Sequence, residues 1–227
     1  MTAMDYEPVP LEGYPAVDDE TLLARAEAAR AALATRRTVR DFSDRPVPRA
    51  VIEACLRAAG SAPSGANHQP WHFACVSDPA LKRQIREAAE AEERSFYEGR
   101  GGARWLKDLE KLGTDASKPF LETAPWLIAI FAQPQSPDEA GDPRKNYYVK
   151  ESVGLATGFL LQTLHSAGLA TLTHTPNPMK FLNAVLGRPA SERPFVLLVV
   201  GHPAEEATVP RYALHKKPLE AIASFFS

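Results

Sequence analysis

The stretch Tyr148–Gly168 constrains the fold of this chain most, because it is the longest helical pattern and it is apolar on most of its sides. Little charge follows Glu151. A helix with this character must be buried in a core or lie in an interface between subunits. Its small and apolar positions are Val149, Val153, Ala156, Gly158, Phe159, Leu160 and Leu164.

The other patterns along the chain alternate between capped helices and short apolar runs. Helices are predicted from Asp18–Asp19 to about Thr35, from Pro48, from Asp78 through Tyr97, and from Lys180 to Leu186. Strands are predicted at Trp71–Val76, Trp126–Phe131, Ala170–Thr173 and Phe195–Gly201, and a polar loop at Gln133–Arg144. Helices therefore flank a few strands without strict alternation, which indicates an α+β fold of three layers.

Composition excludes several classes of protein. A net charge of −2 over 227 residues provides no field for nucleic acid or an anionic membrane. The longest apolar run, Ala124–Ala132, is far shorter than the roughly 20 residues that span a bilayer. The acidic N-terminus does not resemble a signal peptide, and the six histidines lack metal-ligand spacing. We therefore expect a cytoplasmic protein without a metal, in which Cys55 and Cys75 are buried free thiols.

The length fits one domain with arms. Residues 1–17 are predicted to form an N-terminal arm and residues 18–204 the domain. The tail, residues 205–227, has no place in the core, and its apolar end Leu219–Phe226 needs a surface to cover. A partner subunit could provide that surface.

Glu93, Tyr97 and Lys118 form the first candidate site. Glu93 and Tyr97 are four residues apart, so they share one face of a helix. The segment then breaks at Gly99, and a second helical stretch leads to Lys118. A carboxylate, a phenol and an ammonium on a hinged segment could clamp a zwitterion. The alternative is a solvated charged helix beside a mobile loop.

Three further segments are candidates. The cluster Arg36-Arg-Thr-Val-Arg40 provides charge-assisted donors suited to a phosphate, although it could be a solvated basic turn. The small residues of Pro63-Ser-Gly-Ala66 would let a planar ligand approach the backbone, unless they form only a tight connection. Thr173-His-Thr-Pro176 follows a strand end, where ligands often bind, or is a threonine-rich turn. No dinucleotide-binding or P-loop motif is present.

Taken in order, these pieces resemble the nitroreductase superfamily of FMN enzymes. The superfamily pattern is Arg36-Arg-Thr-Val-Arg40, Ala62-Pro-Ser-Gly65 and Gln69-Pro-Trp71. Further matches resemble the iodotyrosine deiodinase branch, over roughly residues 20–225. They are Ser61–Ala66, Glu93 with Tyr97, Arg104-Trp105, Asp108-Leu109, Lys118, Thr123-Ala-Pro125, Leu186-Gly-Arg-Pro-Ala190, Ala207-Thr-Val-Pro210 and Lys217-Pro-Leu219.

The resemblance implies a three-layer α/β/α nitroreductase-like fold with a mixed central sheet, an intertwined homodimer, and a lid at about residues 94–120. It also implies roles for the candidate residues. Ala66 would meet the substrate phenolate through its amide, Glu93, Tyr97 and Lys118 would bind the zwitterion, and Thr175 would donate to flavin N5. The implied FMN-binding residues are Arg36, Arg37, Thr38, Arg40, Pro63, Ser64, Thr173, His174, Thr175 and Lys216. Lys216 stands where the family usually has an arginine, which keeps the charge but loses the bidentate fork.

The implied activity is FMN-dependent reductive dehalogenation of halotyrosines. The electrons would come from a reductase or from reduced nicotinamide. The alternatives are a general nitro- or quinone reductase of the same fold, a flavin-destroying enzyme of the cobalamin-ligand pathway, and a flavin-binding sensor or storage protein without turnover.

Overall fold

A computed structural model describes residues 6–138 and 140–226, and the chain divides into two compact units between Thr35 and Arg36. In the first unit, residues 6–18 lack regular structure, and α1 follows at Asp19–Ala34. The side chain of Asp18 caps this helix by accepting a hydrogen bond from the backbone N–H of Thr21 at 2.7 Å. The predicted start and length of the helix are confirmed.

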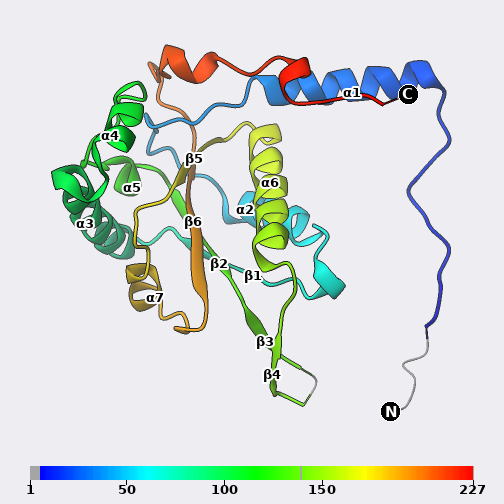
Figure 1. Ribbon diagram of the computed structural model, residues 1–227, viewed down its shortest axis with the longest axis horizontal. Coiled ribbons are helices and arrows are strands. Elements are labelled where there is room, and N and C mark those ends of the chain that lie inside the picture. The colour runs from blue at the N-terminus through cyan, green and yellow to red at the C-terminus, as the bar shows by residue number, and fades with distance from the viewer. Residues whose placement is uncertain (1–5, 139, 227) are drawn as a thin grey trace. The chain divides into compact units, whose positions relative to one another are not determined.

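The second unit is built on a four-stranded sheet with the order β1-β2-β6-β5 (Figure 1). The strands are β1 Trp71–Val76, β2 Trp126–Ala132, β5 Ala170–His174 and β6 Arg193–Gly201, which confirms all four predictions. Within the described sheet, every pairing of these strands is antiparallel. A sheet with both parallel and antiparallel strands was expected. Its parallel part is limited to one bridge, in which Thr38 pairs with Thr171 at the edge of β5.

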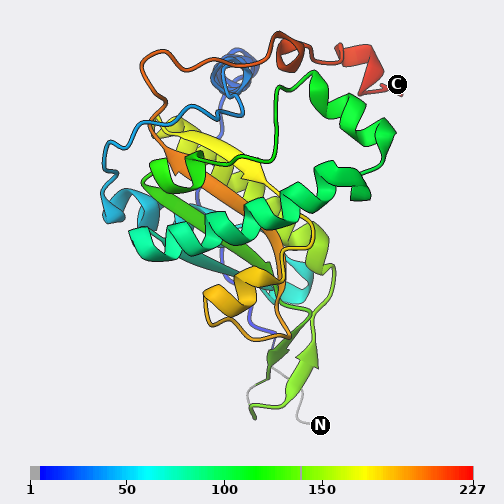
Figure 2. The same ribbon diagram turned by 90° about the vertical axis from the view of Figure 1, so that its left-hand side faces the viewer.

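Helices cover both faces of this sheet and make three layers (Figures 1 and 2). One face packs against α2 Arg49–Gly60 and α6 Val149–Ser166, and the other against α3 Pro79–Ser95, α5 Phe120–Thr123 and α7 Phe181–Val185. The central strand β2 is buried on both faces, since alternate residues point to opposite sides. Leu127 and Phe131 join one core cluster, and Ile128 and Ile130 join the other.

Two predictions are wrong. The segment predicted as a polar loop contains a hairpin, β3 Gln135–Pro137 with β4 Pro143–Lys145, which projects from the sheet (Figures 1 and 2). The Asp138 carboxylate organises its turn by accepting from the backbone N–H groups of Ala140 and Asp142, each at 2.9 Å. Cys55 is buried, but Cys75 is exposed because β1 is an edge strand that the helices cover only in part.

Short elements complete the second unit. A π-helical turn, η2 Phe96–Arg100, and helix α4 Ala103–Glu110 continue from α3. Single turns η1 Gly65–Asn67, η3 Arg211–Leu214 and η4 Leu219–Ala221 lie in the loop after α2 and in the C-terminal tail. The tail leaves its large apolar side chains exposed, with Phe226 at 96%. No helix of the described chain is long and apolar enough to cross a membrane.

Candidate active site

A cavity of about 200 Å³ lies where the end of α3, η2, α4 and the carboxyl end of β5 meet. It brings together seven of the residues singled out from the sequence, which come from four separate segments of the chain. They are Arg40, Glu93, Tyr97, Lys118, Thr173, His174 and Thr175. We call the segment from Phe96 to Lys118 the lid, because its hinge glycines set it apart from α3. Gly99 has a φ of 138° and Gly102 a φ of 72°, conformations that side chains other than glycine rarely adopt.

Glu93, Tyr97 and Lys118 meet inside this cavity. The Glu93 Oε2 to Lys118 Nζ distance is 3.3 Å, and the Lys118 side chain is only 3% exposed. The Tyr97 hydroxyl donates to the carbonyl of Thr114 at 2.9 Å, and Lys118 Nζ lies 5.8 Å from the centroid of the Tyr97 ring. The three groups are therefore a buried cluster, which argues against the solvated-helix alternative.

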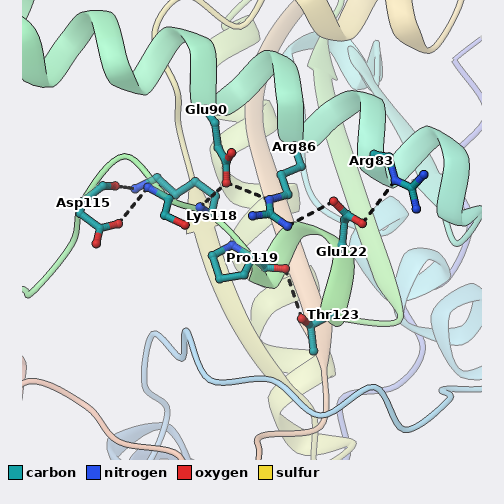
Figure 3. Close-up of polar contacts among 9 residues, drawn as sticks. Arg83, Arg86, Glu90, Asp115, Lys118, Pro119, Glu122 and Thr123 are labelled. Atoms are coloured by element: carbon teal, nitrogen blue, oxygen red, sulfur yellow. Dashed lines mark hydrogen bonds and ion pairs between the residues drawn. The ribbon is translucent and has the colours of Figure 1, made fainter.

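Hydrogen bonds to the lid on one side and to α3 on the other hold Lys118 in place (Figure 3). Its ammonium donates to Thr114 Oγ1 at 3.1 Å and to the carbonyl of Asp115, and its backbone N–H donates to Glu90 Oε1 at 2.7 Å. The same Glu90 oxygen accepts from Arg86 Nε at 2.8 Å. Although burial alone would raise the pKa of the Glu90 carboxyl, these two donors lower it. The end of the lid is thus tied to α3 by a charged anchor.

Aromatic packing shapes the lid. The rings of Phe96 and Trp105 meet edge to face, with their centroids 5.0 Å apart. A Cβ atom at Gly101 would lie 2.5 Å from the Phe96 ring, so a larger residue there would force the ring to shift. Both aromatic residues line the cavity, yet the sequence reasoning did not place them in the site. The signal available was the apolar face Trp105, Leu106 and Leu109 of a short helix after a glycine hinge.

A second anchor joins the lid to the loop that follows β5. Arg100 Nη2 donates to the carbonyl of Asn177 at 2.5 Å and pairs with Glu92 Oε2 at 2.8 Å. Asn177 lines the cavity two residues after Thr175, and it was also missed from the sequence. The lid is therefore bonded directly to the loop that follows β5.

The cavity is electrostatically positive at the β5 end. Burial lowers the pKa of the Arg40 guanidinium, an effect that Tyr97 and Asp41 oppose. Burial, together with the charges of Lys118 and Arg40, lowers the pKa of His174 to about 3, so its imidazole is neutral at pH 7. Burial likewise raises the pKa of the Tyr97 phenol, with Glu93 and Asp115 adding to the effect. The cavity favours neutral or anionic groups beside Arg40.

The remaining predicted residues lie outside the lining of this cavity. Arg36, Arg37 and Thr38 run half-buried along the edge of β5, where the Val39 N–H donates to the Thr171 carbonyl at 3.1 Å. Lys216 is exposed in the tail and donates to the Ala213 carbonyl at 3.1 Å.

Pro63, Ser64 and Ala66 belong to the loop between α2 and β1, on the α2–α6 side of the sheet (Figure 1). The Gly65 N–H of this loop donates to Ser152 Oγ in the first turn of α6, at 3.4 Å. A single copy of the chain thus carries the predicted residues in three places. They are the lid cavity with the neighbouring edge of β5, the loop at the N-terminal end of α6, and the tail that contains Lys216.

Comparison with known proteins agrees with these features. Residues 33–202 match the model of the nitroreductase family. The iodotyrosine deiodinase of Haliscomenobacter hydrossis is 52% identical over 193 residues, which cover 85% of this chain and 87% of that protein. Human iodotyrosine deiodinase 1 is 44% identical over 90% of this chain and 70% of its own length.

A solved structure of an iodotyrosine deiodinase bound to FMN and 3-iodo-L-tyrosine superposes with a TM-score of 0.73. It is 32% identical, and the match covers 88% of this chain and 98% of that one. The chain therefore belongs to the nitroreductase family and, within it, to the iodotyrosine deiodinase branch.

Proposed function

We propose that this protein is an FMN-dependent enzyme that removes halogen from halotyrosines and releases halide and tyrosine. The observation that carries the proposal is the buried Glu93–Lys118 ion pair, which lies in the cavity that the end of β5 also lines. The iodotyrosine deiodinases to which the chain is similar support the substrate class.

The residues at the edge of β5 fit FMN. Three guanidinium groups, those of Arg36, Arg37 and Arg40, follow one another in an extended half-buried segment. Guanidinium forks bind phosphate oxygens in pairs, and the desolvated Arg40 gains from an anion beside it. Thr38 adds a hydroxyl for the ribityl chain. Thr173 and Thr175 are exposed at the strand end, whereas His174 is buried and packs edge to face on Phe120.

The lid recognises the amino acid part of the substrate by exchange of ion pairs. Glu93 and Lys118 neutralise each other at 3.3 Å. The substrate ammonium takes the place of Lys118 beside Glu93, and its carboxylate takes the place of Glu93 beside Lys118. Tyr97 fixes the geometry, since its hydroxyl is bonded to the lid backbone at Thr114. Both charges of the ligand are thereby paired in a site that excludes water.

A second copy of the chain completes the site in a homodimer. The loop that contains Pro63, Ser64 and Ala66 lies at the N-terminal end of α6. On the same helix, Leu155 and Phe159 are 47% and 38% exposed. Pairing through this helix brings the Ala66 loop of one copy to the cavity of the other. There the Ala66 amide donates to the phenolate oxygen of the substrate, and Pro63 and Ser64 contact the flavin. The tail, residues 205–227, covers its apolar side chains on the partner, and Lys216 reaches the phosphate.

Residues of this chain then set up the reaction. When bound, reduced FMN would supply the two electrons and the proton with which the carbon–halogen bond is replaced by a carbon–hydrogen bond and halide is released. The Thr175 hydroxyl would donate a hydrogen bond to flavin N5. The closed lid excludes water, and the Ala66 amide holds the ring as phenolate. A reductase or reduced nicotinamide renews the electrons, and the two free thiols fit a cytoplasmic location.

Anaerobic mixing of the FMN-reduced protein with iodotyrosine tests the proposal. The flavin should reoxidise and one iodide should appear per two electrons. Glu93→Gln and Lys118→Ala should each weaken iodotyrosine binding at least tenfold, because they leave one ligand charge unpaired. They should weaken binding of an iodophenol without the amino acid group far less.

Glu98→Gln and Lys107→Ala provide matched controls, since both change an exposed charge of the lid region. Equal losses for iodotyrosine and iodophenol would make the ion pair structural. Turnover of nitroaromatics without release of iodide would identify a general nitroreductase instead. A protein that neither reoxidises nor releases iodide would be a flavin-binding sensor.

A further inference from the structure

The loop that follows α2 is strained. In the described part of the chain, four residues other than glycine have a positive φ. Three of them, Ala66 at 49°, Asn67 at 53° and Gln69 at 48°, fall within this one loop. The fourth, Tyr148 at 48°, faces it across a close contact, because a Cβ at Gly65 would lie 3.0 Å from the Tyr148 ring. Such backbone persists only where the surroundings determine it, and it concentrates at functional sites.

Asn146 makes many of the contacts that impose this backbone conformation. It is 3% exposed, and its side chain joins three segments of the fold. The Nδ2 group donates to the Gln133 carbonyl and to Ser136 Oγ, each at 2.7 Å. Oδ1 lies 3.0 Å from Nδ1 of His68, in the strained loop. The end of β2, the hairpin and the loop are therefore held by one amide.

These contacts also fix the proton on His68. The Gln133 oxygen is a carbonyl and can only accept, so the Asn146 atom bonded to it must be the amide nitrogen. The other Asn146 atom is then oxygen, which can only accept. His68 must donate from Nδ1, and in its neutral form its Nε2 carries the lone pair. The ring also packs against the Tyr147 ring at a tilt of 38°, with the centroids 5.4 Å apart.

The neighbouring contacts leave the loop little freedom. The Gln69 N–H donates to Ser64 Oγ at 2.9 Å, which closes the strained turn on itself. A Cβ at Gly65 would lie 2.8 Å from the Tyr147 carbonyl oxygen, so the backbones at residues 65 and 147 are in direct contact. Asn146 and Tyr147 thus clamp the two residues on either side of Ala66 and Asn67.

We propose that Asn146 and His68 are positioning residues, which hold the Ala66 backbone amide at the angle that recognises the phenolate of the substrate. The inference rests on the proposed function and deepens it, because it assigns the preference for the ionised ring to a buried clamp rather than to the loop alone. Neither residue touches the substrate, and both act through the conformation of residues 64–69.

The first test is made on the FMN-bound protein without substrate. Nitrogen-15 NMR of labelled histidine should show His68 as the Nδ1–H tautomer, the less common form. In Asn146→Ala the signal should change toward the Nε2–H tautomer or average the two. In Ser136→Ala it should stay, because the bonds from Asn146 to His68 and Gln133 remain. An Nε2–H tautomer in the parent protein would overturn the inference.

The second test compares the affinity for iodotyrosine at pH 6 and pH 9, a range that spans ionisation of a halophenol whose pKa lies below the value of about 10 for tyrosine. The parent should bind more tightly at pH 9. Asn146→Ala should lose at least about tenfold at pH 9, the usual effect of a lost hydrogen bond to a charged group, and much less at pH 6. His68→Phe keeps the ring contact with Tyr147 and should show the same pattern. Ser136→Ala is the matched control and should behave as the parent.

The outcomes separate the two proposals. If Asn146→Ala and His68→Phe lose the same affinity for iodotyrosine at both pH values, the clamp is only structural. If their affinities vary with pH as the parent's does, the clamp has no part in recognition. Either result overturns this inference while the proposed function stands. A parent protein that binds no iodotyrosine at all overturns the proposed function and the inference with it.

Discussion

At the scale of single residues, His174 is the most unusual group in the cavity. It is 7% exposed, and Nε2 is the buried side-chain nitrogen or oxygen atom of the described chain that has no hydrogen-bond partner. Burial and the two nearby cations lower its pKa from 6.5 to about 3. The unfolded chain therefore takes up a proton at a higher pH than the folded protein does. The stability that depends on neutral His174 is complete above pH 6.5 and decreases as the pH falls toward 3.

This linkage gives a measurable slope. Between about pH 6 and pH 4, His174 should reduce the free energy of unfolding by ~1.4 kcal/mol per pH unit. The difference in the free energy of unfolding between the parent and His174→Gln isolates the contribution of this residue, because the carboxylates of both proteins titrate alike. Urea unfolding of the FMN-bound proteins at four pH values measures it. If the free energy of unfolding changes with pH in the same way for both proteins, His174 is solvated or protonated in the folded state.

At the scale of elements, the lid depends on its anchors rather than on a core. Trp105 remains 54% exposed, and α4 buries none of its residues. Arg100 supplies one anchor, through Glu92 on α3 and the carbonyl of Asn177 after β5. Segments with few buried contacts open locally at low free energy, so the anchors determine how often the lid opens.

Removal of the Arg100 anchor should therefore expose the lid. Arg100→Gln should speed chymotryptic cleavage between residues 99 and 118 several-fold, and saturating halotyrosine should restore part of the protection because Glu93 and Lys118 still close on it. Lys107→Gln removes an equal charge from an exposed site on α4 and is the control. Cleavage of the Arg100 variant at the parent rate would show that the anchor does not limit opening.

Elements with local signals could be predicted from the sequence, and those fixed by distant contacts could not. Asp18, Pro48 and Asp78 are adjacent to the helices they were predicted to begin, because capping is decided within one turn. The hairpin was missed because its ladder and the Asp138 turn give no periodic pattern in a proline-containing segment. The spacing of Glu93 and Tyr97 indicated a shared face, but nothing local placed Asn177 beside Arg100.

The same distinction holds within the site. Lys118 was predicted as the residue to which the helical stretch after the glycine hinge leads, and the structure pairs it with Glu93. Asn146 lies in a segment with no motif of its own, and its importance follows only from the three segments that its amide joins. A buried polar residue of this kind is recognised from its bonds, which the sequence does not contain.

At the scale of the whole molecule, one protomer does not bring all the expected site residues together. The α6 face carries Leu155 and Phe159, next to Gly154 and Gly158, where no atoms outside the local helix lie within 4 Å of an added Cβ. Phe159→Asp places a charge on this face without disturbing the core of the protomer. In the proposed homodimer, in which the second copy completes each site, this change should give a monomer and weaken FMN binding.

Sedimentation velocity and FMN retention on dilution measure the two effects. Ala80→Asp adds the same charge at an exposed position of α3, on the opposite side of the sheet, and should remain a dimer that holds FMN. A Phe159→Asp protein that stays dimeric and yellow would place the interface elsewhere. Loss of the dimer without loss of FMN would show that one protomer binds the cofactor alone.

The Glu93–Lys118 pair has a consequence for molecules that are not substrates. The two side chains are 3% and 14% exposed and neutralise each other, so a ligand with a single charge that binds between them must separate them and leave one uncompensated. An amine without a carboxylate, or an acid without an amine, is penalised even if its ring fits perfectly. With the proposed roles of Glu93 and Lys118, we expect selectivity to arise more from the rejection of ligands that carry one charge than from attraction to the zwitterion, so that singly charged phenols bind poorly.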